Sequence, residues 1–70
     1  MSDVALRITV GLTTKANAAV NWLAERTGMS KTDVVNRAVQ LYQFVEQQEA
    51  DGAQLGLIRP DGSVDRMHML

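Results

Sequence analysis

The chain has 70 residues, a net charge of −1 at neutral pH and no cysteine. A chain of this length makes one small domain, which buries only about 60% of its unfolded surface and is marginal by itself. Neither a disulfide nor a thiolate metal site is available to stabilise it. Association with another copy is therefore the expected route to a sufficient hydrophobic core.

Composition also bears on where the protein works. No apolar run approaches the roughly 20 residues that a helix needs to span a bilayer, and the first residues do not resemble a secretory signal. The lack of cysteine suits a reducing compartment, so we expect a cytoplasmic protein. Residues 1–32 hold four basic and two acidic side chains and residues 33–70 hold three and six, an imbalance too small to indicate nucleic-acid binding alone.

After a short N-terminal arm, Met1 to Ala5, residues 6–12 carry the clearest strand signal of the first fifty residues. Apolar side chains occupy every second position and share one face: Leu6, Ile8, Val10 and Leu12. The other face is formed by Arg7, Thr9 and Gly11. No second strand signal lies nearby, and unpaired backbone groups are costly, so the segment is expected to pair antiparallel with the same segment of a second copy. Pairing with the C-terminal tail of its own chain is the alternative and would give a monomer.

Two helices are predicted after this strand. The first runs over residues 15–27, with Thr13 or Thr14 as N-cap and Gly28 as the left-handed residue that ends it. Small and apolar residues form one stripe along it: Ala16, Ala19, Val20, Leu23, Ala24 and Thr27. The stripe predicts a close approach by another helix.

The second helix is predicted from Lys31 to about Ala50, with Gly52 as its stop. Ser30 and Asp33 form a variant of the capping box, and Met29 and Val34 have the spacing of a hydrophobic staple. Apolar residues cover a wide face of this helix: Val34, Val35, Ala38, Val39, Leu41, Tyr42 and Val45. Such a broad face suggests more than one neighbour, as in a dimer core.

Residues 53–70 form a tail to the domain at residues 1–52. Arg59-Pro60-Asp61-Gly62 suits a type I turn, and residues 63–70 have the composition of a returning strand, although the alternation is imperfect. Two structures stay open for the tail: a β-hairpin, or disorder until a partner binds.

The order of strand, helix, turn and helix resembles the ribbon-helix-helix family of DNA-binding proteins (Arc, MetJ and CopG type). The resemblance is carried by residues 7–12, residues 23–32 and Val34-Val35. It implies a mostly α fold with one N-terminal strand, in an intertwined homodimer whose two-stranded antiparallel ribbon enters the major groove of double-stranded DNA.

The resemblance also assigns roles to residues of this chain. The outward strand positions, Arg7, Thr9 and Gly11, are expected to face base edges, although glycine departs from the usual polar residue and cannot bond a base. The N-terminus of the second helix is expected to hold DNA phosphates, because its backbone amides and its dipole favour an anion. The residues at that end are Ser30, Lys31 and Thr32.

We therefore expect a sequence-specific transcriptional regulator, acting as a repressor, with several dimers on one site as a further expectation. An antitoxin is the runner-up, with the tail as the segment that binds a toxin. The anchors of that tail would be Leu55, Leu57, Ile58, Val64, Met67 and Met69. Plasmid copy-number or partition control is a third role that the same fold serves. A dimerisation module that does not bind DNA is a rival from another functional class.

No catalytic grouping, cofactor or metal is expected. No nucleophile–base pair, carboxylate pair or glycine-rich phosphate loop occurs in the sequence, and His68 has no second metal-binding side chain near it. The protein is thus predicted not to be an enzyme.

Overall fold

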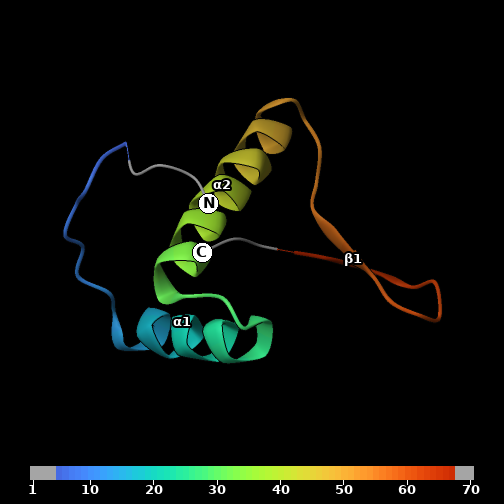
Figure 1. The fold of residues 1–70 in the computed structure, drawn as a ribbon. Coiled ribbons are helices and arrows are strands. Elements are labelled where there is room, and N and C mark those ends of the chain that lie inside the picture. Colours follow the sequence, from blue (N-terminus) through green and yellow to red (C-terminus); the bar gives the residue numbers. More distant parts are fainter. Residues whose placement is uncertain (1–4, 68–70) are drawn as a thin grey trace. The chain divides into compact units, whose positions relative to one another are not determined.

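The computed structural model describes residues 5–67, which form two helices followed by a two-stranded hairpin (Figure 1). The helices are α1 (Thr14–Thr27) and α2 (Lys31–Ala50), and the strands are β1 (Gly56–Ile58) and β2 (Val64–Arg66). The chain divides into two compact units between Val34 and Val35. In the part of the chain that the structure describes, neither helix is long and apolar enough to cross a membrane.

The predicted N-terminal strand is not formed within the single chain. Residues 5–13 have no regular secondary structure, and they form the open blue trace before α1 in Figure 1. A strand requires a hydrogen-bonded neighbour, and β1 and β2 pair with each other. The prediction of one N-terminal strand on a mostly α chain is therefore corrected to two helices with a C-terminal hairpin. The predicted arm, Met1 to Ala5, lies outside the described residues except for Ala5.

Helix α1 begins and ends as its sequence predicts. Thr13, extended at φ −63° and ψ 161°, is the N-cap, and its hydroxyl accepts the Ala16 N–H at 3.1 Å. Gly28 ends the helix in the left-handed region at φ +73°, where a side chain would be strained, and its N–H donates to the Ala24 carbonyl at 2.9 Å. The least exposed residues of α1 are four members of the predicted stripe: Ala16, Val20, Leu23 and Ala24.

Helix α2 also has defined ends. Ser30 caps its start, since the Ser30 hydroxyl accepts the Asp33 N–H at 3.1 Å. At its other end the Ala53 N–H donates to the Gln48 carbonyl and the Gly52 N–H to the Glu49 carbonyl, both at 3.0 Å. This pair of bonds is a Schellman motif, with Gly52 in the left-handed region at φ +92°.

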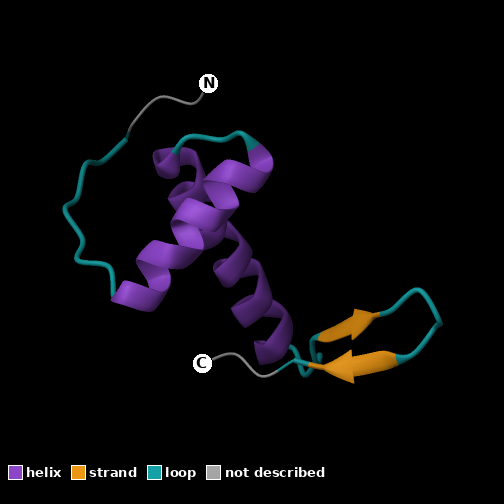
Figure 2. Ribbon diagram, turned by 90° about the horizontal axis from the view of Figure 1, so that it is seen from below, coloured by secondary structure: helices purple, strands orange, loops and turns teal. Residues whose placement is uncertain are grey.

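The tail forms an ordered hairpin, which answers the question that the sequence left open (Figure 2). Strand β1 pairs antiparallel with β2 in the register Gly56–Arg66, Leu57–Asp65 and Ile58–Val64. The Gly62 N–H donates to the Arg59 carbonyl at 2.8 Å and closes the predicted turn. Gly62 itself has φ +87°, as in three-residue hairpin loops that end in a left-handed residue.

Little apolar surface is buried in the single chain. Among the described residues, only Val34 and Val45 are buried. Most of the wide face predicted for α2 is exposed between them, with Val35 half-buried and Val39 and Leu41 63% and 61% exposed. Exposed apolar surface of this extent is typical of interaction sites.

Candidate nucleic-acid interface

The three residues expected to face bases lie in the open segment before α1. Arg7, Thr9 and Gly11 are all exposed, and so are the apolar residues that alternate with them, from Leu6 at 76% to Leu12 at 45%. In the single chain this segment therefore has no buried face, and its apolar side chains are available to a neighbour.

Neither the backbone conformation nor the packing of the single chain requires a glycine at position 11. Its φ is not among the positive values found at other glycines, and a Cβ built on it meets no heavy atom within 4 Å. A side chain would fit at this position without strain.

The residues expected to hold phosphates lie together in the first turn of α2 and its cap. Ser30, Lys31 and Thr32 are exposed. The Ser30 hydroxyl already accepts one backbone N–H, but a hydroxyl also has a hydrogen to donate to an anion. Lys31 adds a positive charge at the helix end that already favours negative groups. The arrangement is chemically suited to a phosphate.

On α1, Arg26 stacks over the Trp22 ring, with its guanidinium carbon 5.4 Å from the ring centroid. Trp22 remains 60% exposed in the single chain. A cation over an exposed ring contributes about 0.5–1 kcal/mol. This pair was not anticipated from the sequence, although the spacing of four residues on a helix brings such side chains together.

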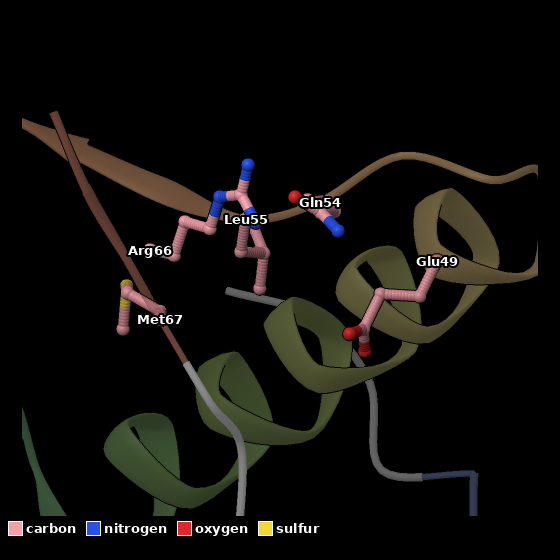
Figure 3. Close-up of a pocket in the computed structure, with 5 residues that line it drawn as sticks. All are labelled: Glu49, Gln54, Leu55, Arg66 and Met67. Atoms are coloured by element: carbon pink, nitrogen blue, oxygen red, sulfur yellow. The ribbon is translucent and has the colours of Figure 1, made fainter.

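The tail residues proposed as anchors for a partner do not form one surface. Ile58 and Val64 lie opposite each other on one face of the hairpin, and Leu57 lies on the other face beside Asp65. Leu55 and Met67 line a shallow pocket of about 200 Å³ with Glu49, Gln54 and Arg66 (Figure 3). Met69 lies outside the described residues, as does His68.

Two polar contacts define the hairpin and were not predicted. Arg59 and Asp65 form an ion pair across the strands, with the Arg59 Nε–H donating to Asp65 Oδ2 at 2.6 Å. Asp61 Oδ1 accepts from both the N–H and the hydroxyl of Ser63, at 2.9 and 2.7 Å. These two donors lower the pKa of the Asp61 carboxyl below its usual value.

The described residues contain no group of three or more side chains suited to a metal ion. Comparisons with protein families, curated proteins and solved structures find no match to this chain.

Proposed function

We propose that the protein is a homodimeric, sequence-specific DNA-binding regulator, most simply a repressor, whose two N-terminal segments pair as an antiparallel ribbon. The proposal depends on one observation: four alternating apolar side chains stand exposed in a segment that directly precedes a capped helix. If a second copy supplies the neighbouring strand, these side chains can be buried while the backbone groups that the two strands turn toward each other are paired.

Dimerisation also accounts for the sparse core. A chain with two buried side chains among its described residues cannot offset the conformational entropy lost on folding. Pairing of residues 6–12, together with the exposed face of α2, supplies the missing burial. The ribbon then turns Arg7, Thr9 and Gly11 away from the core.

In this dimer Arg7 donates two hydrogen bonds to a guanine, and Thr9 bonds a base edge or touches a thymine methyl. Ser30, Lys31 and Thr32 hold the flanking phosphates, which position the ribbon without selecting a sequence. The limited number of basic residues, seven in the chain, predicts a shallow dependence of affinity on salt unless several dimers bind together.

Selection of bound fragments from a random DNA library, followed by mobility shift on variants of the selected site, tests the proposal. Arg7→Ala is expected to relax the preference at one base pair per half-site by about 1–3 kcal/mol, while the dimer stays folded. Arg26→Ala removes the same charge from α1, and it should leave the preference unchanged.

Light scattering after size exclusion measures the dimer independently. A dimer that selects no sequence would leave a dimerisation module without DNA as the remaining function. A monomer at all concentrations would overturn the ribbon itself.

A further inference from the structure

The two strands of the hairpin differ in their charged residues, since β1 holds none and β2 holds Asp65 and Arg66. Each strand also has one free edge. The Arg59 N–H donates to the Ser63 carbonyl at 2.9 Å and the Met67 N–H to the Leu55 carbonyl at 3.0 Å. Bonded and non-bonded pairs alternate along an antiparallel ladder, so the pairs Gly56–Arg66 and Ile58–Val64 are non-bonded and their backbone groups point outward. Gly56 and Ile58 form the outer edge of β1, and Val64 and Arg66 form that of β2.

We propose that the β1 edge pairs antiparallel with the β1 edge of a second copy, joining two hairpins into a four-stranded sheet. The register that uses both outward residues is centred on Leu57. It places Gly56 opposite Ile58 of the partner subunit, and each of these two symmetric pairs exchanges two backbone hydrogen bonds. Leu57 then faces its own counterpart at the centre.

No charge opposes this pairing. Strand β1 is Gly56-Leu57-Ile58 and holds no charged residue; in this register the nearest one, Arg59, falls opposite Leu55 of the partner subunit and not opposite a like charge. The equivalent register for β2 would centre on Asp65 and set two carboxylates directly opposite each other, which is destabilising. Charges of this kind protect a sheet edge from association, so β2 is the protected edge and β1 the available one.

The side chains on the Ile58 face fit the same register. A Cβ on Gly56 would lie 3.0 Å from Val64 Cγ1, so Val64 already leans over the space that Gly56 leaves empty. The partner's Ile58, seated opposite Gly56, would meet Val64 across this gap. Ile58 and Val64 are 79% and 62% exposed in the single chain, and pairing would bring them into contact with their counterparts in one apolar cluster.

Amide hydrogen exchange on the purified full chain tests the pairing directly. The Gly56 and Ile58 N–H groups are expected to exchange more slowly than those of Val64 and Arg66, although all four point outward within the hairpin. Equal exchange at the two edges would overturn the proposal.

A matched pair of proline variants tests the same edge. Ile58→Pro and Val64→Pro each remove one outward N–H and one apolar side chain, and neither removes a bond within the hairpin. Ile58→Pro is expected to abolish the slow exchange at Gly56, whereas Val64→Pro should retain it. Retention in both variants would contradict the pairing.

Isotope-filtered nuclear Overhauser spectra on mixed labelled and unlabelled chains identify the occupant. Contacts between Leu57 side chains of different copies support the proposal, and contacts from Ile58 to Ile8 would overturn it in favour of pairing with the N-terminal segment. This inference does not require DNA binding: a protected β1 edge in a protein that selects no DNA sequence would disprove the proposed function and leave the hairpin pairing standing.

Discussion

The Ser30 hydroxyl is proposed to serve both α2 and a DNA phosphate. As the N-cap it accepts the Asp33 N–H at 3.1 Å, an interaction that contributes about 1 kcal/mol to stability in other helices. As a phosphate ligand it would donate its own hydrogen. The two roles respond differently to a negative charge, because aspartate is a good cap but repels phosphate.

Ser30→Asp is therefore expected to keep or raise the free energy of unfolding while weakening binding to all DNA sequences alike. Thr13→Asp changes the cap of α1 in the same way and should have a smaller effect on binding. Chemical denaturation and mobility shift measure the two quantities. Full DNA affinity in the Ser30 variant would remove this helix end from the interface.

Among the elements, local signals predicted the helices well and the strands poorly. Caps depend on neighbours within a few residues, so Ser30, Gly28 and Gly52 were found from sequence, and the structure chooses Thr13 over Thr14. The hairpin depends on register, and only the register places Asp65 beside Arg59. The prediction of an N-terminal strand was wrong for the single chain, because a strand cannot form without a hydrogen-bonded neighbour.

In the candidate site, too, local sequence patterns were informative and features that depend on a partner strand were not. Alternation in residues 6–12 predicted which side chains share a face, but all seven residues are exposed in the single chain, so the structure does not test that division. The role of Arg7, Thr9 and Gly11 in reading DNA stays a prediction, because it depends on a second chain and on DNA. Among the tail anchors, the pattern did not separate Ile58 from Leu57, which the pairing places on opposite faces.

The hairpin turn is expected to weaken in acid. Asp61 has a lowered pKa because the Ser63 hydroxyl and N–H bind its carboxylate, so the turn is stabilised above the usual aspartate pKa of about 3.9. That contribution is lost as the pH falls through the lowered value. The Ser63 amide proton shift, followed by NMR from pH 6 downward to about pH 2, should report the loss.

Asp61→Asn provides the control for this titration. The amide oxygen of asparagine still accepts from Ser63 but does not titrate in this range. The Ser63 shift of the variant should therefore stay constant where that of the natural chain moves. An identical titration in both proteins would assign the change to another group.

At the scale of the whole molecule, folding and dimerisation are expected to be one event. The described chain buries only Val34 and Val45, so a separated chain has little to stabilise it. The midpoint of thermal unfolding should then rise with protein concentration, as expected when the folded state is an obligate dimer. Neighbouring residues of the N-terminal segment offer a sharper test.

Ile8→Lys and Thr9→Lys place the same charge one position apart. In a ribbon, position 8 faces the core and position 9 faces outward, because side chains alternate along a strand. Ile8→Lys would bury an unpaired ammonium group from each copy, which is strongly destabilising, so the dimer and the helical circular dichroism should both be lost. Thr9→Lys should remain a folded dimer with altered DNA preference. Equal stability and equal sedimentation of the two variants would show that residues 6–12 have no buried face, and the ribbon would have to be abandoned.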